Sequence, residues 1–333
     1  MVLSLLVENR ETVKILYLPN EYSQQRQREK KRKIYPILMA MEAEWYRKQG
    51  YEVAWGGPYY QAGQYDMVIT EPEGLPFLSL PHPDRVFTRW WEYQDNGNFK
   101  YHPGTYIQAA NGCWHGKCTF CVEQKNKWEV REVDDVISEI NECQALGFKE
   151  IFDDSGTFPI GRWLDEFLKS DILVRCGIRF GCNMRLVDAP YSEMARRNFR
   201  LLLFGLESAN QQTLNKINKG VKVEDYKYII KAARAGLEPH VAVIFGHPNE
   251  TDNDALRTLK LVHYLLRRGY AKTAQASFYR VPGEAGQEAH RKFIKRIYEV
   301  AYSPQFWFNQ IKDIKDVADL KYLWRKMKAG LEK

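Results

Sequence analysis

A regular alternation of strand-like and helix-like segments after about residue 105 constrains the fold of this chain more than any other feature. Apolar positions in the helix-like segments recur with helical spacing, as at Val136, Ile137 and Ile140. Strands separated by helices favour a parallel sheet, and six of them favour a partial parallel (β/α)6 TIM-like barrel in an α/β protein. The six strands are expected at 105–110, 149–154, 178–185, 200–208, 240–246 and 274–283.

The first hundred residues show a shorter version of the same pattern. An apolar run at 13–18 precedes a helix that Pro36 opens and Gly50 closes, and two more strands are expected at 51–56 and 65–70. This order predicts a small Rossmann-like α/β unit. We expect this unit with a linker at 1–104, the barrel at 105–285 and a C-terminal helical extension at 286–333.

Composition narrows the class of protein and of partner. No segment approaches the ~20 uninterrupted apolar residues of a membrane helix, and the first residues, MVLSLLVENRET, lack the basic region of a signal peptide. We therefore expect a cytoplasmic protein without a membrane partner. The 49 Lys and Arg residues against 42 Asp and Glu are compatible with an anionic substrate, including nucleic acid. We interpret the basic run at 26–33 as a solvated loop.

Three of the six cysteines, Cys113, Cys118 and Cys121, fall within nine positions, in the segment NGCWHGKCTFC. Cysteine thiolates ligate iron–sulfur clusters, and three of them can hold a cubane while leaving one iron open. A structural zinc site with His115 as fourth ligand is an alternative, as are three unrelated thiols. Two classes of function follow: a cluster enzyme, or a nucleic-acid-binding or regulatory protein that uses the triplet for zinc or for a redox-sensing cluster.

The triplet resembles the signature of the radical S-adenosylmethionine (SAM) superfamily. The usual spacing there is C-x3-C-x2-C, whereas this sequence has C-x4-C-x2-C, one residue longer in the first gap. The aromatic residue before the third cysteine also matches, as Phe120, where the family places a side chain against the adenine. The resemblance implies that the three cysteines bind a [4Fe–4S] cluster and that SAM binds its open iron.

Further segments resemble the family at the ends of successive strands, and the resemblance covers roughly residues 105–285. FDDSGTFP corresponds to the loop that meets the methionine amino group, and FGLES to the strand that approaches the methionine carboxylate and the ribose. VIFGHPNET resembles the stretch beside the adenine, and YRVPGE the final strand. The resemblance implies cofactor-binding roles for Phe120, Asp153, Asp154, Arg185, Glu207, Ser208, Ile244 and Gly246.

The resemblance also implies a reaction. Reductive cleavage of SAM would give methionine and a 5′-deoxyadenosyl radical, which abstracts hydrogen from an unactivated carbon. Methyl transfer is one outcome within the family. A reductant protein of the flavodoxin or ferredoxin type would supply the electron.

The N-terminal unit resembles the cobalamin-binding-domain branch of the superfamily, in a shortened form. It shows three strands where a full domain has about five, and it lacks a D-x-H-x-x-G motif after the first strand. Cobalamin is therefore a further cofactor to test, with a degenerate or minimal domain as the alternative. Methylthiotransferases carry a second cluster on three N-terminal cysteines, and this sequence has none before Cys113. The remaining cysteines, Cys143, Cys176 and Cys182, lack the spacing of an auxiliary cluster.

Overall fold

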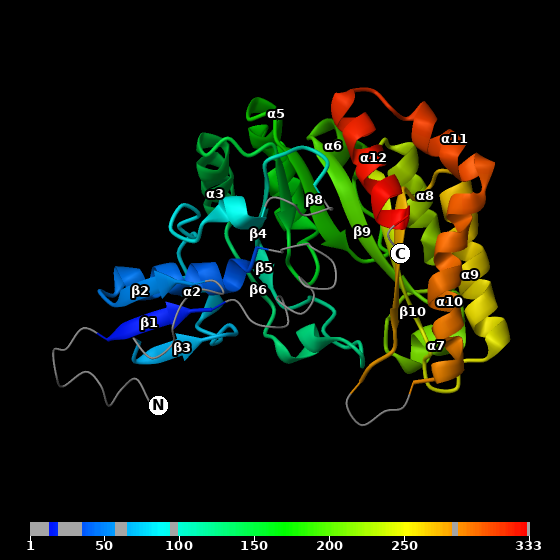
Figure 1. Ribbon diagram of the computed structural model, residues 1–333, viewed down its shortest axis with the longest axis horizontal. Helices are drawn as coiled ribbons and strands as arrows, with labels where there is room; N and C mark the ends of the chain where they lie inside the picture. Colours follow the sequence, from blue (N-terminus) through cyan, green and yellow to red (C-terminus); the bar gives the residue numbers. More distant parts are fainter. Residues whose placement is uncertain (1–12, 19–34, 57–64, 94–98, 282–285, 332–333) are drawn as a thin grey trace. The chain divides into compact units, whose positions relative to one another are not determined.

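The computed structural model describes residues 13–18, 35–56, 65–93, 99–281 and 286–331. The chain divides into two compact units, Met1–Asn98 and Phe99–Lys333, which are described separately (Figure 1). The basic run at 26–33 and the Pro-Gly pair at 282–283 lie outside the described residues. Within the described ranges, no helix combines the length and the apolar character that crossing a membrane requires.

The first unit contains a three-stranded parallel sheet in the order β2-β1-β3. This is the order of the first three strands in flavodoxin-like folds, and it confirms the predicted small parallel α/β unit. Its elements are β1 (Lys14–Tyr17), α2 (Ile37–Lys48), β2 (Glu52–Trp55) and β3 (Met67–Ile69), followed by short 3₁₀ segments at Phe77–Ser79 and Trp90–Tyr93.

Helix α2 binds the chain segment that follows β3 through a buried carboxylate. Glu42 is 1% exposed, and its oxygens accept hydrogen bonds from the backbone N–H groups of Glu73 at 2.9 Å and Gly74 at 3.0 Å. Burial raises the pKa of Glu42 in spite of these bonds. These hydrogen bonds therefore attach the segment 73–75 to helix α2.

The second unit is built on a six-stranded parallel sheet in the order β11-β10-β9-β8-β7-β4. Strands β4 and β11 form its two edges, so the sheet is an open, partial barrel, as the sequence predicts. The strands are β4 (Gly104–Ile107), β7 (Glu150–Asp153), β8 (Arg179–Met184), β9 (Phe199–Glu207), β10 (Glu238–Phe245) and β11 (Thr273–Phe278).

Helices connect these strands in the expected alternation. They are α3 (Val133–Ala145), α4 (Arg162–Lys169), α5 (Ile172–Arg175), α6 (Tyr191–Arg196), α7 (Gln211–Lys216), α8 (Lys227–Arg234) and α9 (Asp252–Arg267). The C-terminal part adds α10 (Arg291–Ile297), α11 (Pro304–Lys312) and α12 (Val317–Leu331), and α9, α10 and α11 lie side by side (Figure 1). Helix α5 and the two-residue antiparallel pair β5 (Ala110–Asn111) and β6 (Glu129–Val130) have no counterpart in the sequence prediction.

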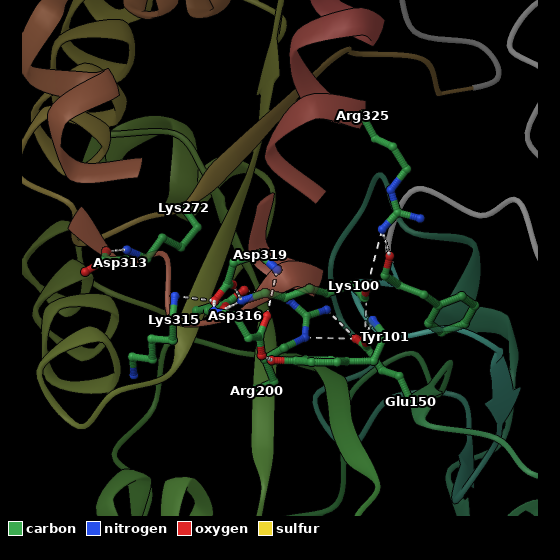
Figure 2. Close-up of polar contacts among 12 residues, drawn as sticks. Lys100, Tyr101, Glu150, Arg200, Lys272, Asp313, Lys315, Asp316, Asp319 and Arg325 are labelled. Atoms are coloured by element: carbon green, nitrogen blue, oxygen red, sulfur yellow. Dashed lines mark hydrogen bonds and ion pairs between the residues drawn. The ribbon is translucent and has the colours of Figure 1, made fainter. Parts of the chain in front are cut away.

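An ionic network fixes the amino-terminal ends of the strands (Figure 2). Arg200, near the start of β9, pairs with Glu150 of β7, its Nε lying 2.9 Å from Oε1, and with Glu238 of β10, its Nη1 lying 2.6 Å from Oε2. Lys100 Nζ lies 2.7 Å from Glu238 Oε1 and also pairs with Asp319 of α12. Buried charges need partners, and these pairs link the first residues of β7, β9 and β10 to each other and to α12. The carboxyl-terminal ends of the strands lead into loops.

Candidate active site

The cysteine loop follows β4 and is closed at its base by the β5–β6 pair. Gly112 opens the loop with a φ of +71°. A Cβ atom at this position would lie 2.9 Å from the carbonyl oxygens of Asn126 and Lys127. Only glycine therefore fits where the first residues of the loop lie against its last residues. The short β5–β6 ladder and this close approach make the loop a compact structure.

The three thiols of the loop are free. Cys118 is buried, while Cys113 and Cys121 are half-buried. Burial raises the pKa of Cys121, and the neighbouring Glu123 carboxylate raises it further. A thiol of this kind becomes a thiolate when a metal binds, because metal binding displaces the proton.

The donor chemistry of this loop fits an iron–sulfur cluster. Among the residues that the structure describes, no three His, Cys, Asp or Glu side chains converge as the ligands of one metal ion must. A cubane makes a different demand, because each thiolate binds its own iron atom. Three cysteine thiols on one glycine-bounded loop, without a fourth, are the ligand set that leaves one iron of a cubane open.

Arg185, at the end of β8, faces the cysteine loop. Its Nη1 donates a hydrogen bond to Cys118 Sγ across 3.8 Å, and its guanidinium carbon lies 5.0 Å from the centre of the Trp114 ring. Its Nη2 donates to the backbone carbonyl of Lys219. The side chain is only 6% exposed, so its charge is held close to the sulfur.

The two aspartates after β7 have different surroundings. Asp153 is fully buried and accepts hydrogen bonds from the N–H groups of Ala109 at 2.7 Å and Ser155 at 3.1 Å. Burial raises its pKa to about 6, against the effect of these bonds. Asp153 therefore holds the segment after β4 in place, and its carboxylate points into the protein.

Asp154 is accessible, yet burial of its charge raises its pKa to about 7, with further contributions from Asp153 and Glu123. The segment that follows packs against the cysteine loop, since a Cβ atom at Gly156 would collide with the carbonyl oxygen of Gly112. Of the two aspartates, Asp154 is the better placed to meet a cationic ligand.

At the end of β9, Glu207 forms a buried ion pair that also reaches the cysteine loop. Its Oε1 lies 2.8 Å from Lys219 Nζ, and both residues are 6% exposed. Lys219 Nζ lies 5.8 Å from the centre of the Phe120 ring. Gly205 makes room for the pair, because a Cβ atom there would collide with both charged groups. The backbone of Glu207 has a φ of +60°, an uncommon conformation for a residue other than glycine.

Ser208 is directed into the protein. It is fully buried, and its Oγ lies 3.4 Å from Thr258 Oγ1 and accepts a hydrogen bond from the N–H group of Asn210 at 3.1 Å. These contacts join the end of β9 to α7 and α9. The hydroxyl is thus occupied within the fold.

The end of β10 carries Ile244, which is half-buried, and Gly246. Gly246 has a φ of +85°, and a Cβ atom at this position would collide with the Phe278 ring of β11. Its N–H group donates to Glu250 Oε2 at 2.6 Å, and the same oxygen lies 3.0 Å from His290 Nδ1. This turn is therefore compact and closely packed on the neighbouring strand.

His115, in the lengthened first gap of the triplet, anchors the loop. Its Nε2 lies 2.6 Å from the carbonyl oxygen of Asn218, so Nε2 carries the proton and donates. A Cβ atom at Gly220 would lie 2.5 Å from the His115 ring. The cysteine loop and the turn at 218–220 therefore hold each other in place. The sequence does not predict this contact, because His115 and Asn218 are 103 residues apart in the chain.

The positions predicted from sequence therefore gather at the carboxyl-terminal ends of β7, β8, β9 and β10, next to the loop that follows β4. Functional residues in folds of this kind come from these strand ends. Phe120, Asp154, Arg185 and Glu207 lie around or beside the cysteine loop, whereas Asp153 and Ser208 are tied into the protein. The structure adds Trp114, Glu123 and Lys219 to the site.

Comparison with known proteins agrees with this geometry. Residues 107–262 match the family model described as "Radical SAM superfamily". The tRNA-2-methylthio-N(6)-dimethylallyladenosine synthase of Coxiella burnetii is 28% identical over 221 residues, which cover 60% of this chain and 48% of the relative. The chain spans about half the length of the curated relatives it matches.

Two solved structures share the fold. The radical S-adenosylmethionine methyltransferase TsrM from Kitasatospora setae, with cobalamin and a [4Fe–4S] cluster bound, aligns with a TM-score of 0.50 at 19% identity, covering 61% of this chain and 40% of that one. The apo form of the cobalamin-dependent S-adenosylmethionine radical enzyme OxsB aligns with a TM-score of 0.50 at 12% identity, covering 92% of this chain and 49% of that one. Residues 107–262 therefore form a radical SAM domain, and the second unit has the fold of two solved radical SAM enzymes.

Proposed function

We propose that the protein is a radical SAM enzyme that modifies an unactivated carbon of its substrate, and that Cys113, Cys118 and Cys121 hold the [4Fe–4S] cluster. The observation that carries the proposal is the three-thiol loop, with the Arg185 guanidinium against Cys118 Sγ at 3.8 Å. When bound, the cluster supplies the electron that cleaves SAM into methionine and a 5′-deoxyadenosyl radical. A small electron-transfer protein is the expected source of that electron.

The residues around the loop would bind and orient SAM. Asp154 is an accessible carboxylate suited to the methionine ammonium group. Arg185 supplies positive charge that suits the methionine carboxylate, whereas the charge of Lys219 is balanced by Glu207. Phe120, Ile244 and the Gly246 turn would contact the adenosine. Because Asp153 and Ser208 are occupied within the fold, we assign them supporting roles.

Methyl transfer is the specific reaction that we propose. The curated relatives include enzymes named as tRNA methylthiotransferases, and one structural neighbour is named as a methyltransferase. The described part of the N-terminal unit contains three strands in a flavodoxin-like order. We assign cobalamin no step in the reaction. Nucleic acid is the substrate class that the relatives' names favour.

Anaerobic reconstitution tests the cluster. We expect a brown protein that binds about four irons and, when reduced, converts SAM to 5′-deoxyadenosine. Replacing any one of the three cysteines by alanine should abolish both properties, whereas Cys176→Ala, at a half-buried cysteine outside the loop, should leave them unchanged. A colourless protein with one bound zinc would support the regulatory alternative and overturn the proposal.

The products identify the transferred group. S-adenosylhomocysteine formed alongside 5′-deoxyadenosine would establish methyl transfer, and 5′-deoxyadenosine without S-adenosylhomocysteine would exclude it. Running the assay with and without added cobalamin then decides whether the N-terminal unit contributes that cofactor.

A further inference from the structure

A cavity of about 690 Å³ opens at the end of the second unit opposite to the cysteine loop. Lys149 directly precedes β7, Arg179 opens β8, and Tyr101 lies three residues before β4. Helix α12 forms the other wall. We call this cavity the basal cleft and define it by six of its lining residues: Tyr101, Lys149, Arg179, Lys321, Trp324 and Arg325.

Positive charge lines the basal cleft. Four of the six residues that define it are cationic, and no Asp or Glu is among the described residues that line the cavity. Lys149, Arg179 and Lys321 are exposed. Arg179 is held by a hydrogen bond of 2.9 Å from its Nη1 to Asn198 Oδ1, which orients the guanidinium without neutralising it. Fixed cations without lining carboxylates attract an anion.

Carboxylates near the cleft reduce this charge without cancelling it. The buried network beneath it contains Glu150, Glu238 and Asp319 against Lys100 and Arg200, an excess of one carboxylate. Asp316 Oδ2 accepts a hydrogen bond from the Tyr101 hydroxyl at 3.3 Å. Set against the three exposed cations Lys149, Arg179 and Lys321, these groups leave a surplus of one positive charge.

The buried network also fixes the shape of the cleft (Figure 2). Asp319 ties the first turn of α12 to Lys100, and Arg325 Nη2 donates to the carbonyl oxygens of Phe99 at 3.1 Å and Lys100 at 3.4 Å. Both walls are therefore attached to the same short segment at 99–101. A preformed cleft loses less entropy on binding than a mobile one.

Two aromatic side chains accompany the cations. Trp324 is 63% exposed, and it lies on one face of α12 with Val317 and Leu320, which are also exposed. Tyr101 is half-buried, and the Arg179 guanidinium carbon lies 5.7 Å from the centre of its ring. Aromatic rings among cations are the surface that single-stranded nucleic acids use, because bases stack on the rings while phosphates meet the charges.

We propose that the basal cleft binds a single-stranded nucleic acid segment, with phosphates on Lys149, Arg179 and Lys321 and a base on Trp324. The cleft lies at the amino-terminal strand ends, so this contact is separate from the site of radical chemistry. An acidic protein would use the same cations, but it would not need an exposed tryptophan beside them. The proposal does not depend on the cluster, because none of its residues belongs to the cysteine loop.

Fluorescence anisotropy with a labelled 12-nucleotide oligouridylate and the full chain, carrying its reconstituted cluster, tests the proposal. We expect the double variant Lys149→Glu/Lys321→Glu to weaken binding about tenfold or more and to reduce the slope of affinity against salt by roughly 1 to 2. Trp324→Ala should weaken binding about fivefold or more with an unchanged salt slope. Thermal unfolding of each variant shows whether the fold is retained.

The matched control is Lys260→Glu/Arg267→Glu, the same change of charge on another basic surface of this unit, along α9. It should leave oligonucleotide affinity within about twofold of the parent protein. Equal weakening by the two double variants, no effect of Trp324→Ala, or no binding by the parent protein would each overturn the proposal. Displacement of the oligonucleotide by polyglutamate at equal charge would also overturn it, in favour of an acidic protein partner. Because SAM cleavage is assayed separately, loss of nucleic-acid binding and loss of the proposed chemistry are distinguishable.

Discussion

Arg185 and Cys118 form a charge-assisted contact in which the guanidinium Nη1 lies 3.8 Å from the thiol sulfur. The contact joins the end of β8 to the second cysteine of the loop. Hydrogen bonds and charges at cluster sulfurs tune the potential of an iron–sulfur centre. We therefore expect this pair to affect the potential of the cluster that we propose on Cys118.

Arg185→Gln should lower the midpoint potential of the cluster by roughly 50–100 mV, because the cation stabilises the more negative, reduced state. An anaerobic redox titration followed by electron paramagnetic resonance measures this shift. Arg196→Gln, an exposed arginine on α6, is the control and should leave the potential unchanged. An unaltered potential in Arg185→Gln would show that the contact to Cys118 has no electrostatic role.

Lys219→Met should lower the free energy of unfolding by about 3 kcal/mol, because it leaves the Glu207 carboxylate buried without its partner. Urea denaturation of the cluster-loaded protein measures the loss. The double variant Lys219→Met/Glu207→Gln removes the stranded charge and should recover part of the stability. No recovery would mean that Lys219 acts through packing alone.

Gly246→Ala should be much more costly than Gly236→Ala, although both glycines have positive φ, +85° and +94°. A Cβ atom at Gly236 meets nothing within 4 Å, whereas one at Gly246 collides with the Phe278 ring. Both variants carry a backbone penalty of about 1–2 kcal/mol, and the collision should add roughly 1–3 kcal/mol. Equal unfolding energies for the two variants would contradict the close packing of β11 on this turn.

His247 should make the protein less stable as the pH falls. Burial lowers its pKa to about 4, below the value of about 6.5 in an unfolded chain, so the neutral form favours the folded state. This stability is complete above pH 6.5 and is lost on acidification, by about 1.3 kcal/mol between pH 7.5 and 5.5.

His247→Phe should remove that part of the pH dependence and keep a ring beside Tyr279, whose centre lies 5.1 Å from that of His247. Urea unfolding at the two pH values measures the difference between variant and parent. The same pH dependence in both proteins would assign the acid sensitivity to other groups.

The parallel sheets and most helices could be predicted from the sequence, because apolar periodicity and glycine or proline boundaries are local signals. The cysteine loop could be predicted for the same reason, since its three cysteines and both glycines lie within ten residues. The short elements could not: β5 and β6 have two residues each, too few for a period, and β5 is separated from its partner by the whole loop.

The part of the site that sequence reasoning missed depends on contacts between distant residues. His115 meets the carbonyl of Asn218, and Trp114 meets Arg185. No local sequence pattern predicts either of these two contacts. The different surroundings of Asp153 and Asp154 also depend on tertiary structure, because Asp153 accepts a hydrogen bond from the N–H group of Ala109, 44 residues earlier in the chain.

Strand β9 carries a buried ion pair at each end, Arg200 with Glu150 and Glu238 at its start and Glu207 with Lys219 at its finish. A slip of one residue against its neighbours would exchange the two faces of the strand and leave charges without partners at both ends of the sheet. Misaligned pairings of this central strand are thus heavily penalised during folding. The strand that carries Glu207 to the candidate active site is therefore one whose alignment its own charges specify at both ends.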